Sequence, residues 1–328
     1  MDKKGKKAFN WGIIGTGGIA NAFSKDLDFL DNHAVTAVLS RTKRNAEIFS
    51  NSLDNCKAYV DIDLFLKDGD ICAVYIATPN TLHCNQTIKS LKAKIPVLCE
   101  KPFSMNFEEA NQMIEHSKIN STSLLDGMWM RYLPHISKLN DLLSKNVIGK
   151  IESIYAFHGQ NLRWSNNPRL WTKELGGGAL LDLGIYVVSF CHMIAGSPDE
   201  IFASSIFTQE GVDSKTSMVF KYENGLIANL SCSMYDNQPN RAIISGSEGY
   251  IEIDHTFYAP TTIRLYKNDQ EMVEYKNDYD GHGLRQQAIY MEKCVSDKKL
   301  ESNKMSHKDT LEVMKIMDEV RRKTGLKF

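Results

Sequence analysis

The stretch Trp11-Gly-Ile-Ile-Gly-Thr-Gly-Gly-Ile-Ala20 decides the fold class of this chain. It follows an apolar run that starts at Ala8 and precedes a run with helical spacing, so it predicts a strand, a glycine-rich turn and a helix. Gly15 permits the tight turn, Gly17 lets the main chain approach a pyrophosphate, and a small Ala20 lets the helix pack against the strand. Such turns also occur for purely structural reasons, but the order strand, turn, helix favours a dinucleotide site. Its residues are Gly15, Thr16, Gly17, Gly18, Ile19 and Ala20.

The N-terminal part of the chain continues this alternation of strands and helices. Apolar or β-branched runs predict strands at 8–14, 34–40, 71–77, 96–99 and 123–128, and helical spacing predicts helices at 19–30, 44–53, 83–93 and 107–118. Strands that alternate with helices at this spacing indicate βαβ units and a doubly wound parallel sheet. We therefore expect an α/β protein whose residues 1–125 form a Rossmann domain.

The remainder of the chain has a different pattern. A helix at 134–145, a strand at 150–160 and a helix that opens at Gly176-Gly-Gly178 and ends near residue 195 precede a series of strands, at 200–208, 217–222, 226–233, 241–245, 250–254 and 262–266. Short turns between these strands predict an antiparallel meander. A C-terminal helix at 306–323, with Ser306 as its cap and Gly325 beyond its end, is a candidate to pack back on the first domain. Because 328 residues exceed one comfortable core, residues 126–328 are predicted to form a second, α+β domain.

The composition excludes several classes of function. A formal net charge of −1 argues against a general binder of nucleic acid. The charged start, residues 1–7, is not a signal peptide, and no apolar stretch approaches the roughly 20 residues that span a bilayer, so no membrane partner is expected. The seven scattered cysteines form no Cys-x-x-Cys pair, which favours reduced core residues in a cytoplasmic protein. No cluster of His, Cys and carboxylates has the sequence spacing of metal ligands, so no metal is expected.

The end of the second predicted strand, Leu39-Ser-Arg-Thr-Lys-Arg44, indicates which dinucleotide binds. An NAD enzyme usually has a carboxylate there for the ribose hydroxyls, and this chain has none. Ser40, Arg41 and Arg44 instead offer a hydroxyl and two guanidinium groups, which suit a 2′-phosphate. A solvated basic loop is the alternative interpretation. The sequence favours NADP(H) over NAD(H).

Three later features are candidates for the chemistry. Thr78-Pro-Asn80 with His83 follows one strand and Glu100-Lys101 follows the next, at the edge of a parallel sheet where ligands collect. The first could equally be a simple helix start. A Glu-Lys pair at the end of a buried strand is harder to explain, because its two charged side chains have to be accommodated at a buried position. Asp182 and Tyr186 are four residues apart on an apolar helix, so they share a face, and the carboxylate needs a partner or a function.

Taken together, these motifs resemble the Gfo/Idh/MocA family, and within it the branch of dimeric dihydrodiol dehydrogenases and NADP-dependent D-xylose dehydrogenases. The resemblance covers essentially the whole chain. It rests on the glycine-rich turn, Ser40-Arg41, Ala77-Thr-Pro-Asn80, His83, Glu100-Lys-Pro102, Met128-Trp-Met-Arg-Tyr-Leu-Pro134 and the segment from Gly176 to Tyr186. It implies a Rossmann domain followed by an open, mostly antiparallel sheet through which members commonly form dimers or tetramers.

The resemblance also implies roles for individual residues. Lys101 would contact the nicotinamide ribose and the reacting hydroxyl, and Asp182 and Tyr186 would complete the acid–base set. Many members carry His at the position of Tyr186, and the dihydrodiol branch carries Tyr. Whether Lys101 or Tyr186 accepts the proton stays open, since both side chains have ordinary pKa values near 10. Candidate substrate contacts are Trp129, Arg169 and Trp171; candidate cofactor contacts beyond the turn are Ser40, Arg41, Arg44, Thr78, Pro79, Asn80, His83, Glu100 and Lys101.

The expected activity is therefore reversible, NADP(H)-dependent hydride transfer at a hydroxyl or carbonyl carbon of a sugar, polyol or dihydrodiol. Two alternatives come from other classes of protein. A dinucleotide-binding sensor of the same fold would catalyse nothing, and the set Lys101, Asp182 and Tyr186 argues against it. An NAD-dependent glycosidase would retain its cofactor, and the basic end of the second strand argues against it.

Overall fold

The computed structural model describes residues 8–68 and 70–328, so the charged start of the chain lies outside the described residues. The chain divides into two compact units, and each is built from two segments. The first unit takes the residues up to Trp129 together with Gly281–Thr310, and the second takes Met130–Asp280 together with Leu311–Phe328.

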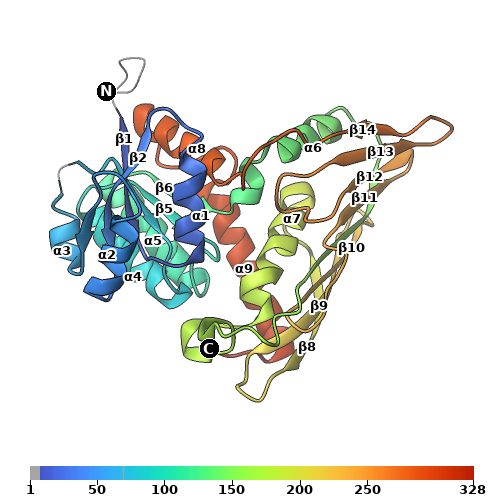
Figure 1. Ribbon diagram of the computed structural model, residues 1–328. Coiled ribbons are helices and arrows are strands. Elements are labelled where there is room, and N and C mark those ends of the chain that lie inside the picture. The colour runs from blue at the N-terminus through green and yellow to red at the C-terminus, as the bar shows by residue number, and fades with distance from the viewer. Residues whose placement is uncertain (1–7, 69) are drawn as a thin grey trace. The chain divides into compact units, whose positions relative to one another are not determined.

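The first unit contains a six-stranded, fully parallel sheet, which confirms the Rossmann prediction. Its order is β3-β2-β1-β4-β5-β6, with β1 (Phe9–Ile14), β2 (His33–Leu39), β3 (Lys57–Tyr59), β4 (Ala73–Ile76), β5 (Val97–Glu100) and β6 (Leu124–Gly127). Every residue of β4, β5 and β6 is buried, as expected for parallel strands covered on both faces (Figure 1). The helices of this unit are α1 (Gly18–Leu27), α2 (Lys43–Ser50), α3 (Ile62–Phe65), α4 (His83–Lys92), α5 (Phe107–Asn120), α8 (Arg285–Ser296) and the start of α9 (His307–Thr324).

Helix α8 joins the first unit although it follows the second unit's sheet in sequence, and the sequence pattern did not predict it. Two contacts fasten it to the start of the chain. Asp26, at the end of α1, accepts hydrogen bonds from the Arg285 guanidinium at 3.0 Å and from the Arg285 N–H at 2.7 Å. Glu292 accepts one from Asn32 at 2.7 Å. These contacts hold the helix that follows the glycine-rich turn.

The second unit contains an eight-stranded mixed sheet in the order β14-β13-β12-β11-β7-β10-β9-β8. Its strands are β7 (Ile151–Gly159), β8 (Glu200–Phe207), β9 (Asp213–Lys221), β10 (Ile227–Ser233), β11 (Ala242–Gly246), β12 (Gly249–Ile253), β13 (Ile263–Lys267) and β14 (Val273–Tyr275). The sheet is mostly antiparallel, as predicted, but the simple meander is wrong. β7 lies between β10 and β11 and pairs with β10 in parallel. The early strand is thus inserted into the later ones.

Helices cover one face of this sheet and leave the other open. Figure 1 shows α6 (Pro134–Ser144) and α7 (Ile185–Ala195) on the same side of the strands. Along β9 the side chains of Met218 and Phe220 are buried while that of Val219 between them is exposed, which is the alternation of a sheet with one solvated face.

One segment contradicts the expectation that no apolar stretch could span a bilayer. By length and composition alone, the helix over residues 173–195 is long and apolar enough to cross a membrane. However, 83% of the most apolar window is buried inside the fold, which is how the core helix of a folded domain behaves.

Two smaller predictions have clear outcomes. The Ser306 hydroxyl accepts the N–H of Asp309 at 3.1 Å, and Gly325 has a φ of +79° just beyond α9, so both helix-end assignments are confirmed. All seven cysteines are free; Cys99, Cys191, Cys232 and Cys294 are buried, and the other three are partly exposed.

Candidate active site

The glycine-rich turn has the geometry that a dinucleotide requires. Gly15 has a φ of +115°, and a Cβ there would lie 2.5 Å from the carbonyl oxygen of Ala77. Gly17 and Gly18 are exposed, and a Cβ on either would meet no atom within 4 Å. Gly17 precedes α1 and has no side chain, so no cap hydrogen bond from this position competes for the first N–H groups of the helix. The turn therefore fits a pyrophosphate at a helix N-terminus.

The end of β2 adds a hydroxyl and two cations beside this turn. The Ser40 hydroxyl lies 3.2 Å from the Thr16 hydroxyl. Arg41 and Arg44 are exposed, and neither forms an ion pair within residues 8–68 and 70–328. Their guanidinium groups are thus available to a phosphate, which fits the predicted 2′-phosphate of NADP(H).

The loops after β4 and β5 are joined by a buried histidine. The two ring nitrogens of His83 each lie 2.9 Å from a main-chain carbonyl oxygen, that of Thr78 and that of Pro102. His83 is 0% exposed and Asn80 is 3% exposed. We interpret His83 as a residue that holds the two loops in place, while Thr78 and Pro79 lie at the partly exposed edge.

The Glu100-Lys101 pair ends β5 next to these loops. Glu100 is 3% exposed, and its carboxylate accepts hydrogen bonds from the Tyr75 hydroxyl and from the N–H of Lys101. Lys101 is partly exposed, whereas Trp129, at the end of the unit's first segment, is 6% exposed. The structure thus gathers the predicted residues of the first unit at the carboxyl ends of β1, β2, β4 and β5.

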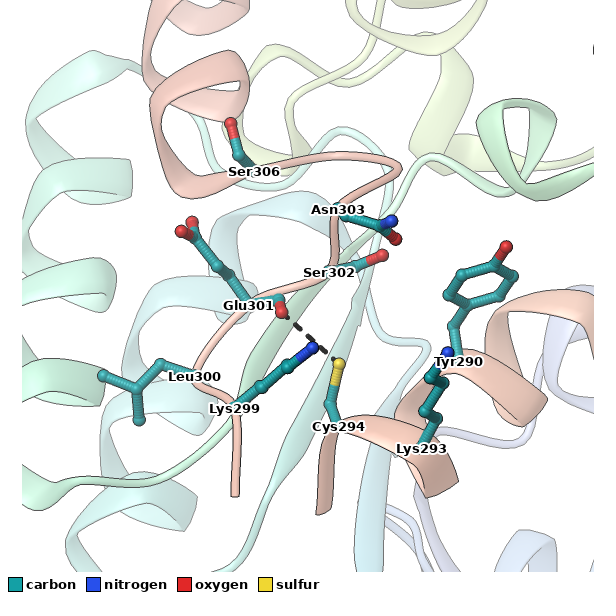
Figure 2. Close-up of a pocket in the computed structure, with 9 residues that line it drawn as sticks. All are labelled: Tyr290, Lys293, Cys294, Lys299, Leu300, Glu301, Ser302, Asn303 and Ser306. Atoms are coloured by element: carbon teal, nitrogen blue, oxygen red, sulfur yellow. Dashed lines mark hydrogen bonds between the residues drawn. The ribbon is translucent and has the colours of Figure 1, made fainter. Parts of the chain in front are cut away.

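A separate hollow of about 410 Å³ lies between α8 and the segment before α9 (Figure 2). Its lining includes Tyr290, Lys293, Lys299 and Ser302, and none of the predicted site residues. The carboxylate of Glu301 already accepts the N–H of His307 at the start of α9, at 2.5 Å. This hollow is therefore no part of the candidate active site.

In the second unit, the triple glycine brings Arg169 and Asp182 together. A Cβ on Gly177 would lie 2.7 Å from the carbonyl oxygen of Arg169, so only glycine allows the two segments this close. Asp182 lies in a π-helical turn, Leu180–Gly184, and its carboxylate is 3.0 Å from the Arg169 guanidinium. Such turns occur often at functional sites.

Asp213, which the sequence pattern did not single out, supports this turn. Its Oδ2 accepts the N–H of Leu180 at 2.9 Å and the hydroxyl of Thr216 at 2.7 Å. Gly178 has a φ of +112°, and a Cβ there would lie 2.3 Å from Asp213 Oδ1. Burial raises the pKa of Asp213 to about 6, against the lowering effect of its hydrogen bonds. The glycine and the buried carboxylate are therefore packed as one element.

We expect Asp213→Asn to change how stability depends on pH. Because the folded-state pKa, about 6, lies above that of an unfolded aspartate, ionisation opposes folding. The free energy of unfolding of the wild type should fall as pH rises from the pKa of an unfolded aspartate to about 6. The variant has no carboxyl group at this position, so its free energy of unfolding should not fall for this reason. The free energy of unfolding of the variant minus that of the wild type should therefore rise by up to about 3 kcal/mol between about pH 4 and 7. Urea unfolding at both pH values measures the difference; a flat or falling difference contradicts the assignment.

Tyr186 lies on α7, in a cluster of rings. Its centroid is 5.2 Å from that of His158, at the end of β7, and 4.9 Å from that of Tyr258. His158 stacks on Tyr258 at 4.0 Å, and the Gln160 amide donates to His158 Nε2 and to the Tyr258 hydroxyl, each at 3.1 Å. Tyr186 is 5% exposed, so the cluster fixes its ring.

Trp171, the third predicted substrate residue, packs beside the same turn. Its ring lies 6.1 Å from that of Tyr235, and its indole N–H donates to the carbonyl oxygen of Ser165 at 3.3 Å. It also contacts the buried cluster that includes Leu170 and Leu183. Much of its surface thus serves packing.

Sequence reasoning missed several residues that contact the predicted ones within each unit: Tyr75 in the first, and His158, Asp213 and Tyr258 in the second. Tyr75 carried a weak signal, because a tyrosine within a buried apolar strand has a hydroxyl that needs a hydrogen-bond partner. Asp213 carried none, since Asp213-Ser-Lys-Thr216 has the composition of a loop and precedes the apolar part of β9.

Two family models match the chain. The model described as the oxidoreductase family, NAD-binding Rossmann fold, matches residues 9–125, and the model described as the GFO/IDH/MocA C-terminal domain matches residues 136–252.

Relatives of known activity match over nearly the full length. The trans-1,2-dihydrobenzene-1,2-diol dehydrogenases of Danio rerio and Mus musculus are 32% and 31% identical to this chain, and each alignment covers 98% of both chains.

Solved structures share the fold. KijD10, a 3-ketoreductase from Actinomadura kijaniata in complex with NADP and TDP-benzene, is 22% identical with a TM-score of 0.86 over 97% of this chain and 98% of that one. A levoglucosan dehydrogenase in complex with NADH and L-sorbose is 20% identical with a TM-score of 0.85 over 98% and 97%.

Proposed function

Because the chain belongs to the Gfo/Idh/MocA oxidoreductase family, we propose that it is an NADP(H)-dependent dehydrogenase of CH–OH groups in sugars, polyols or dihydrodiols. One observation carries the proposal for this chain's own residues. An open glycine-rich turn at the start of α1 lies beside two exposed arginines at the end of β2, with Lys101 two strands away in the same sheet. That arrangement fits an NADP(H) molecule whose nicotinamide end reaches the end of β5.

The chain's residues would handle the proton and the orientation of the substrate. When bound, NADP⁺ supplies the hydride acceptor. Lys101 and Tyr186 are the proposed groups that remove the hydroxyl proton, and Asp182 completes the set. The ring cluster of His158 and Tyr258 fixes Tyr186, and the pairing of Asp182 with Arg169 fixes the carboxylate.

The pairing of Arg169 with Asp182 also supports an uncharged substrate. Their atoms are 3.0 Å apart, so the two opposite charges offset one another near the site. A neutral hydroxylated ring suits such a pair and the neighbouring aromatic side chains better than a phosphorylated or carboxylated one does. The dihydrodiol in the names of the relatives is of this neutral kind.

A substrate screen tests the proposal. Neutral sugars, polyols and dihydrodiols are offered with NADP⁺ and, separately, NAD⁺, and absorbance at the NADPH band is followed. We expect turnover with members of this panel and faster turnover with NADP⁺. NADPH binding without any turnover would instead support a sensor, and a retained NAD without net change of cofactor would support a glycosidase.

The remaining features of the proposal concern organisation. We propose that residues 1–125 bind the cofactor and 126–328 the substrate, that the protein works in the cytoplasm, and that it forms a homodimer or homotetramer through the open face of the eight-stranded sheet. Support comes from exposed apolar side chains on its strands, among them Phe202, Ile206, Val219, Ile227 and Tyr250. A large exposed apolar surface is typical of an interface.

We expect Phe202→Glu to weaken this assembly, because Phe202 is 56% exposed and pairs with Val219 on the open face. Light scattering after gel filtration should show a lower mass than for the wild type. Ile119→Glu is the matched control, since Ile119 is 72% exposed on α5 of the first unit. A wild type that is already monomeric contradicts the proposed interface.

A further inference from the structure

We propose that Tyr75 and Glu100 form a buried positioning pair that fixes Lys101 relative to the helix of the dinucleotide turn. This inference rests on the proposed function, since it assigns how that function's lysine is held. Neither residue belongs to the proposed proton-transfer set, and Tyr75 lies inside a strand rather than in a loop.

The pair occupies one face of two neighbouring strands. Tyr75 of β4 is in register with Leu98 of β5, and Glu100 is two residues beyond Leu98, so both side chains lie on the same face. The Tyr75 hydroxyl donates to Glu100 Oε1, and Glu100 Oε2 accepts the N–H of Lys101 at 3.1 Å. Tyr75 is 0% exposed and Glu100 is 3% exposed. A carboxylate buried at this depth costs free energy unless its hydrogen bonds are made, so the hydroxyl is needed there.

The residues on both sides of Lys101 are held by contacts from β4 and from the start of α4. Glu100 precedes Lys101 and is bound by Tyr75; Pro102 follows it, and its carbonyl oxygen lies 2.9 Å from His83 Nδ1. The partly exposed Lys101 is therefore flanked by two buried, anchored neighbours. Its main chain has little freedom to move along the edge of the sheet.

Tyr75 also reaches the dinucleotide helix. Its ring stacks on that of Phe23 of α1, with centroids 4.0 Å apart and planes 24° apart. One side chain thus contacts the helix that begins at the glycine-rich turn and, through Glu100, the main chain of Lys101. This gives a direct physical path by which the position of the cofactor's helix and that of the lysine depend on each other.

The neighbours of Glu100 also influence the charge of its carboxyl group. Burial raises the pKa of Glu100 to about 7, the Tyr75 hydrogen bond and the charge of Lys101 lower it, and Asp126 on β6 raises it. The carboxylate and the lysine amine therefore interact electrostatically as well as through the main chain.

The first test measures turnover. Tyr75→Phe keeps the ring on Phe23 and removes only the hydroxyl, and Glu100→Gln keeps the shape and removes the charge. We expect each to lower kcat about 10- to 100-fold, as displacements of about 1 Å do, while the Kd of NADPH changes less than about threefold. The double variant should be no worse than the poorer single variant, because the two side chains act as one unit.

The matched control is Tyr59→Phe, which removes another Tyr–carboxylate hydrogen bond of the first unit, to Asp68 at 2.6 Å. It should leave kcat unchanged. A kcat within twofold of the wild type for Tyr75→Phe overturns the inference, and so does an equal loss in Tyr59→Phe.

A second test needs no turnover. Competitive labelling of lysine amines in the protein without cofactor, followed by peptide mass spectrometry, reports the reactivity of Lys101. A glutamine amide has one acceptor oxygen and cannot accept from both the Tyr75 hydroxyl and the Lys101 N–H, so Lys101 is held less firmly in Glu100→Gln and should label about threefold faster or more, while Lys92 is unchanged. Unchanged labelling of Lys101 overturns the inference. A wild type without activity on any substrate would defeat the proposed function, and labelling alone would then decide the role of the pair.

Discussion

Lys101→Ala should lower kcat by about 10³-fold or more while NADPH still binds. The lysine is the cationic side chain at the end of β5, where the nicotinamide is expected, so its loss removes a proton-transfer group and leaves the glycine-rich turn and the arginines intact. Steady-state kinetics give kcat, and quenching of protein fluorescence by NADPH gives the Kd.

The control for this variant is Lys92→Ala, at the exposed end of α4. It removes the same charge from the same unit and should leave kcat unchanged. Turnover that persists in Lys101→Ala would remove the lysine from the mechanism, and a Kd that rises in parallel with the loss of kcat would reduce its role to cofactor binding.

Arg41→Ala should weaken NADPH binding about 10- to 100-fold and leave NADH binding unchanged. A guanidinium–phosphate contact contributes roughly 1.5–3 kcal/mol, and Arg41 has no competing ion pair within residues 8–68 and 70–328. Titration of both cofactors into wild type and variant gives the ratio of the two affinities. That ratio should also fall with salt in the wild type, because an exposed charge contact is screened.

Lys43→Ala provides the comparison for Arg41. Lys43 lies two residues away and is also exposed, but its amine is 3.7 Å from the Glu47 carboxylate on the next turn of α2, so it already has an ion-pair partner. Its loss should change NADPH affinity by less than about threefold. Equal losses in the two variants would indicate a general effect of positive potential, and an unchanged affinity in Arg41→Ala would contradict the assignment of the 2′-phosphate site.

The parts of the fold that the sequence predicts are those governed by local rules. The glycine-rich turn follows from steric limits at Gly15 and Gly17, and β4 follows from a run of apolar residues that only a doubly covered strand explains. The triple glycine likewise marks the close approach between Gly177 and Arg169.

The parts that escaped prediction depend on contacts between distant segments. The first residues of β9 are polar, and only burial beside Leu180 turns Asp213 into a support for the site. The insertion of β7 between β10 and β11 is a matter of tertiary pairing, for which the strand's own alternation holds no information. Helix α8 has a largely polar sequence, and the ion pair of its Arg285 with Asp26, about 260 positions earlier in the chain, fixes it to the first unit.

The membership of Gly281–Thr310 in the first unit has a consequence for how the protein is made. The ribosome releases Trp129 long before it releases Arg285 and Glu292, because about 150 residues separate the two segments. At roughly 5–20 residues of synthesis per second, about 8–30 s pass between the synthesis of the parallel sheet and that of α8. During that interval Asp26 is a carboxylate without its arginine, and the edge of β6 lacks the main chain of Leu300 that later pairs with Leu124. Nascent chains stalled before residue 281 should therefore be the ones that chaperones and proteases engage, and those stalled well past residue 310 should be resistant.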